Sequence, residues 1–322
     1  MPRPLKPLKL NPDLVVPETA GQKPEWFKVR IQESERYKNI EALVTKHGLA
    51  TVCREARCPN IYECWNAGTA TFMLMGEVCT RACKFCHVKN GNPRMILDHE
   101  EPMKIKESVQ TMGLSYVVLT SVNRDDLPDE GSAHFAETVR QIKSLEKKVL
   151  VETLTPDFRK TQEASVGRML DSGVDVIAHN VETIRRLVPW VRDARCDHDL
   201  SLDFHRTAKR LKPGIITKSS VMVGLGETEA EVVEVFKELR DAQVDVVTVG
   251  QYLQPTKNHH PVIRYVHPDE FKFYESEGLS MGFRFVASGP MVRSSYRAAE
   301  VFIQGMIRKD EKGKSHDHIQ TA

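Results

Sequence analysis

The chain has 322 residues, of which 40% are hydrophobic and 28% charged, and its 46 basic and 44 acidic residues leave a formal net charge of +2. This composition is typical of a soluble globular protein, so it excludes a disordered or fibrous chain, and the balanced charge gives no general argument for nucleic-acid binding. No run of about 18 apolar residues is present, and residues 1–23 lack the apolar centre of a secretory signal, so we expect a cytoplasmic protein.

The N-terminal third begins with a proline-rich stretch, residues 1–25, for which we expect either an extended arm over the domain or a disordered terminus. A helix is predicted over 34–47, because Ile40, Leu43 and Val44 lie on one helical face and Gly48 follows as a stop signal. Residues 51–65 contain Pro59 and are expected to form an irregular loop with one helical turn.

After Gly68, short apolar segments alternate with longer amphipathic ones. Six strands are predicted, at 71–75, 116–120, 149–153, 174–178, 219–223 and 246–251. Five helices are predicted between them, at 105–112, 135–145, 161–171, 200–211 and 229–242. This alternation predicts a parallel α/β sheet with right-handed crossovers, either an open doubly wound sheet or an incomplete barrel.

Unusual polar residues follow the predicted strands at their carboxyl ends, in the segments TSVNRDDL, TLTPDF, AHNVET, VGLGET and GQYLQPT. This end is the functional face of parallel barrels and sheets alike. Beyond the sixth strand we expect a helix at 268–278, a strand at 283–288, a last helix at 292–306 and a polar tail at 309–322.

Six of the seven cysteines form two triplets, which in a reducing compartment favours metal ligation over disulfides. Cys79, Cys83 and Cys86 follow the first strand within eight residues. Three thiolates on an iron–sulfur cube leave one iron open to bind another ligand. The alternatives are a zinc site completed by His87 or a distant cysteine, and plain buried thiols.

With Phe85 before its last cysteine, this triplet resembles the signature of the radical S-adenosylmethionine (SAM) superfamily. The resemblance implies an incomplete parallel (β/α)6 TIM-like barrel, with N-terminal and C-terminal extensions here. It also implies a [4Fe–4S] cluster whose open iron chelates SAM and whose reduction cleaves it to a 5′-deoxyadenosyl radical.

The upstream triplet, Cys53, Cys58 and Cys64, is also one ligand short, and alone it could be a zinc site, a cluster site or unrelated thiols. Together with the sequence RSSY at 293–296, it resembles the lipoyl synthase family, in which a second [4Fe–4S] cluster is completed by the serine before the tyrosine, here Ser295. Without the resemblance, Ser295 would equally be read as a helix cap.

The resemblance extends from KPEWFKVR at Lys23 to RSSYRA, and it implies three regions: an arm and auxiliary-cluster loop (1–68), the barrel (69–252) and a C-terminal extension (253–322). Two residues depart from the family pattern. Arg54 stands where glutamate is usual, and Glu130 interrupts an Asp-Gly-Gly sequence where glycine would adopt a positive φ more readily. We expect both to adjust substrate contacts.

Several residues near strand ends are candidates for SAM contacts, namely His179, Asn180 and Glu182 after the fourth strand and Gly224 and Gly226 in GLGET. A satisfied hydrogen-bond network is the alternative for the first three, and a glycine-rich turn alone is weak evidence. Arg124, Asp125 and Asp126 are expected to order their loop or contact substrate, and Cys196 is expected to be a packing residue.

The family resemblance implies a radical SAM sulfurtransferase of lipoate biosynthesis, which inserts two sulfur atoms at C6 and C8 of a protein-bound octanoyl-lysine group. Cys79, Cys83 and Cys86 would hold the radical-generating cluster, and the cluster on Cys53, Cys58, Cys64 and Ser295 would supply the sulfur.

The implied partners are octanoylated lipoyl carrier domains (2-oxoacid dehydrogenase E2 subunits and glycine cleavage H protein), an electron donor such as ferredoxin or flavodoxin, and cluster-assembly carriers, with no nucleic acid or membrane. The alternatives are another two-cluster enzyme, such as a methylthiotransferase, and a zinc-stabilised binding protein.

Overall fold

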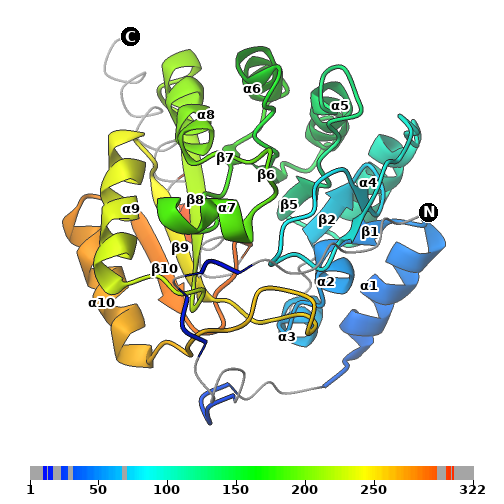
Figure 1. The fold of residues 1–322 in the computed structure, drawn as a ribbon. Helices are drawn as coiled ribbons and strands as arrows, with labels where there is room; N and C mark the ends of the chain where they lie inside the picture. Colours follow the sequence, from blue (N-terminus) through cyan, green and yellow to red (C-terminus); the bar gives the residue numbers. More distant parts are fainter. Residues whose placement is uncertain are drawn as a thin grey trace.

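The computed structural model describes residues 10–12, 14–16, 23–27, 32–66, 71–295, 302–305 and 307. Its centre is an eight-stranded sheet in the order β1-β2-β5-β6-β7-β8-β9-β10. Figure 1 shows this sheet curving around an axis, with helices on its outer face. Because β1 and β10 are the two ends of the order and do not pair with each other, the barrel is open.

Seven strands of this sheet are parallel to one another: β2 (Thr71–Leu74), β5 (Tyr116–Ser121), β6 (Leu150–Leu154), β7 (Val176–Ala178), β8 (Ile216–Val223), β9 (Val246–Gln251) and β10 (Phe285–Gly289). The first six are the predicted barrel strands, in chain order. The short β1 (Ala50–Thr51) pairs antiparallel with β2. The predicted incomplete parallel α/β barrel is therefore confirmed.

Six long helices cover the outer face: α4 (Glu101–Thr111), α5 (Ser132–Lys143), α6 (Gln162–Asp171), α8 (His198–Leu211), α9 (Glu229–Asp241) and α10 (Pro268–Ser280). Local capping sets several of their starts. Asp197 accepts a hydrogen bond from the Leu200 N–H at the start of α8, and Thr228 with Glu231 forms a capping box at α9. The predicted α1 (Glu35–Lys46) is capped by Ser34 in the same way.

The barrel interior is closed at the amino ends of its strands by an apolar layer. Tyr116, Val118, Leu150, Val176, Ile216 and Val246 form this layer together with Ile303 from the helical residues 302–305. Above it lies a buried ion pair between Lys218 and Glu152, with 2.6 Å between Nζ and Oε1. An interior filled at this end leaves the carboxyl end of the barrel as the place for a cavity.

One helical turn was predicted within 51–65, where the structure has two short helices, α2 (Val52–Glu55) and α3 (Ile61–Asn66). Other short elements were not predicted: β3 (Val78–Cys79), β4 (Lys89–Asn90), η1 (Arg185–Leu187) and α7 (Val188–Val191). The last predicted helix does not begin at Val292, because 292–295 form a loop and turn, whereas 302–305 are helical. Tyr296 and the tail 309–322 lie outside the described residues. The division into regions ending at 68 and 252 stays a prediction.

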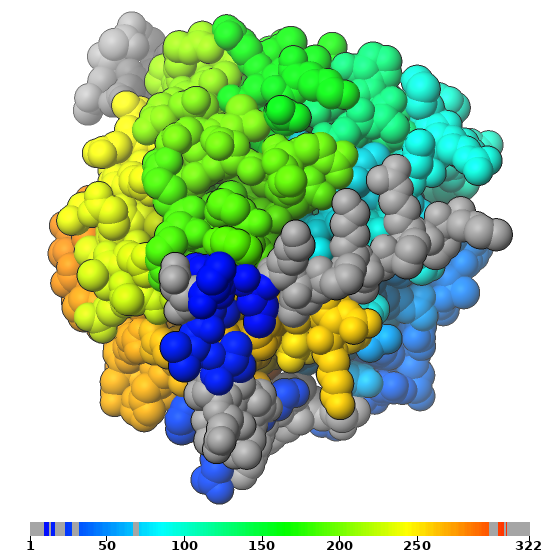
Figure 2. Space-filling model, viewed as in Figure 1, coloured from blue at the N-terminus to red at the C-terminus, as the bar shows by residue number. Residues whose placement is uncertain are grey.

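The described parts of the N-terminal arm contact the barrel near the carboxyl ends of its strands. The side chain of Leu14 packs on Gly226, and the rings of Trp26 and Phe27 lie 5.3 Å from those of His267 and Tyr265. In Figure 2 the arm (dark blue) lies on the surface between the green and gold parts of the chain. This agrees with the expected extended arm for the residues described.

None of the helices in the described ranges has the length and apolar character needed to cross a bilayer.

Candidate active site

A cavity of about 510 Å³ opens at the carboxyl ends of the barrel strands, a size that suits a small-molecule site. All seven cysteines line it, and all are free thiols rather than disulfides. Ser295 lines it too, although the serine lies far along the chain from both triplets. The structure therefore brings every predicted cluster ligand to one cavity.

The downstream triplet lies at the end of β3 and in the loop that follows this strand. The sulfur of Cys79 accepts hydrogen bonds from the N–H groups of Arg81 (3.4 Å) and Asn123 (3.3 Å), and that of Cys83 accepts one from the Asp193 N–H (3.3 Å). Such donors favour thiolates over thiols. Burial nevertheless raises the pKa of Cys79, and a hydrogen bond with Cys196 together with burial raises that of Cys83, so these donors would favour the thiolates only with the help of a nearby positive charge.

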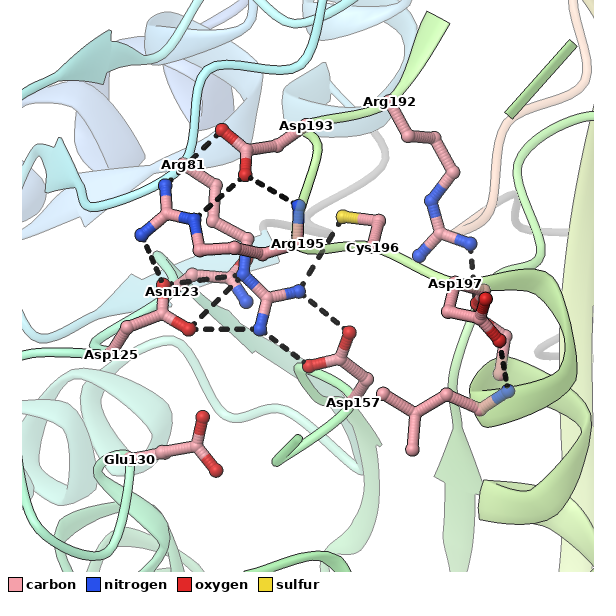
Figure 3. A network of polar contacts seen from close by, with 12 residues as sticks. Arg81, Asn123, Asp125, Glu130, Asp157, Arg192, Asp193, Arg195, Cys196 and Asp197 are labelled. Atoms are coloured by element: carbon pink, nitrogen blue, oxygen red, sulfur yellow. Dashed lines mark hydrogen bonds and ion pairs between the residues drawn. The ribbon is translucent and has the colours of Figure 1, made fainter. Parts of the chain in front are cut away.

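A network of buried charges holds this loop (Figure 3). Arg81 lies between the first two cysteines, and its guanidinium donates to both oxygens of Asp157 (2.6 and 2.7 Å) and to Asp125 (2.9 Å). Arg195 donates to Asp125 (3.3 Å) and Asp193 (2.8 Å). These carboxylates follow β5, β6 and α7, so three separate segments converge on the cysteine loop.

Two carboxylates of this network, Asp125 and Asp193, are kept ionised by their partners. Burial alone would raise the pKa of Asp125, but hydrogen bonds from Arg81 and Thr80 hold that pKa below its usual value. Burial also opposes ionisation of Asp193, yet Arg195 and the Ala82 N–H lower the pKa of Asp193 to about 2. Asp125 and Asp193 are therefore ionised at neutral pH.

Cys196 belongs to this network, which corrects the expectation that it only packs. Its sulfur accepts a hydrogen bond from Nη1 of Arg81 at 3.4 Å and lines the cavity. A hydrogen bond shared with Cys83 lowers the pKa of Cys196 and raises that of Cys83. A fourth thiol thus lies beside the downstream triplet.

The upstream triplet is carried by two short helices. Cys53 lies in α2, Cys64 lies in α3, and Cys58 lies in the turn between them, where its N–H donates to the carbonyl of Cys53 (3.1 Å). Arg293 lies close enough to Cys58 for their charges to interact, while burial lowers the pKa of the Arg293 guanidinium. Backbone hydrogen bonds, rather than side-chain ion pairs, shape this part of the wall.

The segment 291–295 reaches the upstream triplet through three contacts. The Asn60 amide donates to the Met291 carbonyl (2.7 Å), and the Thr71 hydroxyl donates to Oγ of Ser295 (3.1 Å). The Val292 carbonyl passes so close to Gly250 that a Cβ there would lie 2.2 Å from its oxygen. Because glycine has no side chain, Gly250 allows the segment 291–295 to pass this close to β9.

The three predicted SAM contacts after β7, His179, Asn180 and Glu182, all line the cavity, and Nδ2 of Asn180 donates to Oε1 of Glu182 at 3.1 Å. Glu182 is held at a φ of 68°, and burial raises the pKa of its carboxyl. His179 has both ring nitrogens engaged, by the Thr155 carbonyl and Ser201, and burial lowers its pKa to about 4. The satisfied-network alternative therefore describes His179.

Gly224 and Gly226 do not belong to the cavity lining. A Cβ on Gly224 would lie 2.1 Å from Nε2 of Gln251, and one on Gly226 would lie 2.3 Å from Leu14. Protein atoms thus fill the space beside both glycines, which accounts for them by packing. Their predicted role in binding SAM stays a prediction.

The acidic pair after β5 orders loops. Asp125 binds Arg81, and Asp126 accepts from Arg124 (2.9 Å) and from the Met95 N–H (2.8 Å). This is the first of the two roles expected for these residues.

The two departures from the family pattern are both accounted for without a substrate. Arg54 pairs with Glu41 on the surface (3.2 Å) and does not line the cavity, so its expected effect on substrate contacts has no structural support. Glu130 does adopt a positive φ, 53°, and its carboxylate accepts from the Lys160 N–H at 2.9 Å. That hydrogen bond gives the strained residue a role in ordering the loop after β6.

The donor set of the cavity fits iron–sulfur clusters. Burial raises the pKa of Cys53 to about 11 and that of Cys86 to about 12, so their thiolates require a nearby positive charge such as bound iron. No three His, Cys, Asp or Glu side chains in the described part of the chain converge as one metal ion would need. Ligands of a cube are spread over four corners instead.

Sequence reasoning missed the residues that hold the site, above all Arg81, Asp157, Asp193 and Asn60. Arg81 and Asn60 lie inside the two cysteine motifs, and Asp157 follows a predicted strand, so their positions carried a signal. The pairing of Arg81 with Asp157 could not be predicted from the sequence, because the two residues are 76 positions apart.

A sequence model of the radical SAM superfamily matches residues 73–264, more than half of the chain. Lipoyl synthase from Halorhodospira halophila is 57% identical over 280 residues, covering 87% of this chain and 84% of the relative. Lipoyl synthase from Francisella tularensis subsp. novicida is 53% identical over 281 residues, covering 87% and 86%.

Among solved structures, methylornithine synthase matches with a TM-score of 0.50 and 17% identity, over 83% of this chain and 82% of its own. SuiB from Streptococcus suis bound to S-adenosylmethionine matches with a TM-score of 0.53 and 12% identity, over 81% and 57%. These two likenesses support the barrel fold alone. By its sequence relatives, its superfamily match and its barrel, the chain belongs to the lipoyl synthase family of radical SAM enzymes.

Proposed function

We propose that the cavity carries two clusters with separate tasks in inserting sulfur at C6 and C8 of an octanoyl group on a carrier-protein lysine. The cofactors of this family are two [4Fe–4S] clusters and SAM. One observation carries the proposal: both cysteine triplets and Ser295 line a single cavity. A substrate chain that enters this cavity can meet both clusters without leaving.

In this proposal Cys79, Cys83 and Cys86 hold the radical-generating cluster. When bound and reduced, the cluster and SAM supply one-electron chemistry that breaks unactivated C–H bonds, which no side-chain base can deprotonate. The backbone donors to Cys79 and Cys83 keep those sulfurs aimed into the cavity. Asn180 and Glu182, which line the same cavity, offer an amide and a carboxylate to the hydroxyl and amine groups of SAM.

Cys53, Cys58, Cys64 and Ser295 hold the second cluster, which serves as the sulfur-donating substrate. A serine oxygen is a harder donor than thiolate and is poorly matched to cluster iron. Ser295 therefore suits an iron that must be released when sulfide leaves. The Thr71 hydroxyl, 3.1 Å from Oγ, orients this serine toward the cavity.

The serine also separates this function from the alternative two-cluster enzyme. A methylthiotransferase would hold its second cluster on three cysteines without a serine from the C-terminal region. Here Ser295 lines the same cavity as the upstream triplet, which favours the sulfur insertion typical of the lipoyl synthase family.

The substrates of the family are octanoylated carrier proteins. We further propose that this chain acts on the E2 subunits of 2-oxoacid dehydrogenases and on the glycine cleavage H protein. Ferredoxin or flavodoxin would supply electrons, and cluster-assembly carriers would rebuild the spent cluster. Seven free cysteines require a reducing compartment, which supports a cytoplasmic location.

The test is anaerobic incubation of the reconstituted chain with SAM, a reductant and an octanoyl-lysine peptide, followed by mass spectrometry. We expect a product carrying two added sulfur atoms. Cleavage of SAM without added sulfur would contradict the proposal, and purification as a colourless zinc protein would instead support the zinc-stabilised binding protein.

A further inference from the structure

The guanidinium of Arg81 is buried and is held by several hydrogen bonds to two aspartates. It lies between Cys79 and Cys83, and its side chain is only 3% exposed. Nη1 and Nη2 donate to the two oxygens of Asp157 (2.6 and 2.7 Å), while Nε and Nη2 donate to Asp125 (3.2 and 2.9 Å). In this bidentate geometry the planar guanidinium fixes the orientation of the carboxylates and also supplies a positive charge. A lysine ammonium would supply the charge without fixing the orientation.

The partners of Arg81 are fixed in turn. Asp157 follows β6 directly and its side chain is fully buried, and Asp125 follows β5 and also bonds the Thr80 hydroxyl (2.5 Å). On the other side of Arg81, the Ala82 N–H donates to Asp193 (2.8 Å). Three consecutive residues between two cluster cysteines, Thr80, Arg81 and Ala82, are therefore each held by an aspartate, and Figure 3 shows the contacts of Arg81.

Stability alone is a poor reason for such a pair. A buried ion pair is often no more stabilising than well-packed apolar residues of the same volume, because both charges must be removed from water. A pair of this kind is instead well suited to fixing one geometry. It also places formal charges two residues from a sulfur that binds iron, where they act on the charge of the cluster.

We propose that Arg81 and Asp157 are positioning residues of the radical-generating site: they fix the loop from Cys79 to Cys83 in its cluster-binding shape and set the electrostatic environment of that cluster. The inference rests on the proposed role of Cys79, Cys83 and Cys86 as ligands. It assigns to the pair the persistence of this cluster through repeated turnovers.

The test uses the full chain with Arg81→Lys and Asp157→Asn. Glu152→Gln is the matched control, because it also removes a buried carboxylate charge from beside a cation, Lys218, but at the other end of the barrel interior. All three are placed in a Cys58→Ala background, so that the cluster of the downstream triplet alone contributes to the electron paramagnetic resonance signal. The first readout needs no cluster: hydrogen exchange of the Thr80–Cys83 amides in the metal-free chain.

We expect faster exchange of these amides in Arg81→Lys and Asp157→Asn but not in Glu152→Gln. In the loaded protein, Asp157→Asn should shift the reduction potential of the cluster to a more positive value, since a negative charge is removed, while Arg81→Lys should broaden the signal. SAM cleavage should fall in both on the order of tenfold or more, as expected for a misplaced reacting group.

Native exchange, potential and signal in both variants would overturn the inference, and so would equal changes in Glu152→Gln. Cys79→Ala separates this failure from failure of the ligand assignment. If Cys79→Ala kept the cluster signal, the assignment itself would be wrong. If it lost the signal while Arg81→Lys and Asp157→Asn stayed native, only the positioning role would be wrong.

Discussion

The two cysteine triplets line one cavity but are held by different means. The downstream loop is fixed by the buried ion pairs of Arg81 with Asp125 and Asp157 and by the hydrogen bond from the Ala82 N–H to Asp193. The upstream triplet sits on two short helices and is completed by a loop that reaches it through an amide, a hydroxyl and a close approach to Gly250. Each buried charge removed from the first site costs several kcal/mol, whereas single neutral hydrogen bonds contribute about 1 kcal/mol each.

This difference matches the two tasks proposed for the clusters. A cluster that returns to its starting state needs a loop with one well-defined geometry. A cluster that loses sulfide and iron needs ligands that can dissociate from iron and a loop that can rearrange when the cluster is rebuilt. The cavity therefore combines a rigid wall and a more easily rearranged wall around one substrate chain.

The largest expected effects come from removing one cysteine from each site. Cys79→Ala should abolish SAM cleavage, because the radical-generating cluster loses a ligand. Cys58→Ala should leave reductive cleavage measurable while ending sulfur insertion, because only the sulfur source is lost. Chromatography of 5′-deoxyadenosine measures SAM cleavage, and mass spectrometry of the peptide measures sulfur insertion. Native levels of lipoyl product from Cys58→Ala would show that the upstream triplet is not the source.

Ser295→Ala tests the weakest ligand of the upstream site. We expect loss of sulfur-containing product with both clusters at least partly retained, because three cysteines still hold the second cube. Iron analysis and Mössbauer spectroscopy measure the clusters, and mass spectrometry measures the product. Intact turnover would remove Ser295 from the site, and Ser294→Ala, on the neighbouring cavity-lining serine, is the control.

Gly250→Ala tests how the serine segment is positioned. The added Cβ would lie 2.2 Å from the Val292 carbonyl, so the segment must shift and carry Ser295 with it. Sulfur insertion should fall about 10–100-fold, the usual cost of disturbing the residues that support metal ligands, while SAM cleavage is retained. Gly214→Ala is the control, because no atom lies within 4 Å of its added Cβ. Equal rates in the two variants would contradict this role.

Arg54→Glu, which restores the residue usual in the family, should have the smallest effect. Arg54 makes an exposed pair with Glu41 and lies 5.9 Å from the Trp65 ring. Breaking such contacts costs about 1 kcal/mol or less of the free energy of unfolding. Thermal denaturation should show a small decrease and both activities should be native. A large loss of product would mean that this surface contacts the substrate after all.

Much of the scaffold could be predicted from the sequence, because parallel strands such as YVVLT are continuous apolar runs and helices such as Glu229–Asp241 carry their own caps. Elements of two to four residues, such as β3 and α7, have too little pattern to detect. The predicted start of the last helix at Val292 was wrong, because contacts with Asn60 and Gly250 hold 291–295 as a loop, whereas 302–305 within the predicted range are helical.

The cluster ligands could be proposed from spacing and family resemblance, since ligand chemistry restricts residue type. The network behind them could not. Arg81 meets Asp157 and Asp125 only because three strand ends converge in space, and no local pattern records that. For the same reason Cys196 was expected to pack, although it lies beside Cys83 and Arg81.

The most direct measurement follows the sulfur. The native chain and Cys58→Ala are loaded anaerobically with iron and ³⁴S-sulfide, freed of excess sulfide, and given SAM, reductant and an octanoyl-lysine peptide for a single turnover. We predict that the native chain transfers ³⁴S into both positions of the product, whereas Cys58→Ala cleaves SAM and forms none. Unlabelled sulfur in the native product, or labelled product from Cys58→Ala, would contradict the division of labour between the two cysteine triplets.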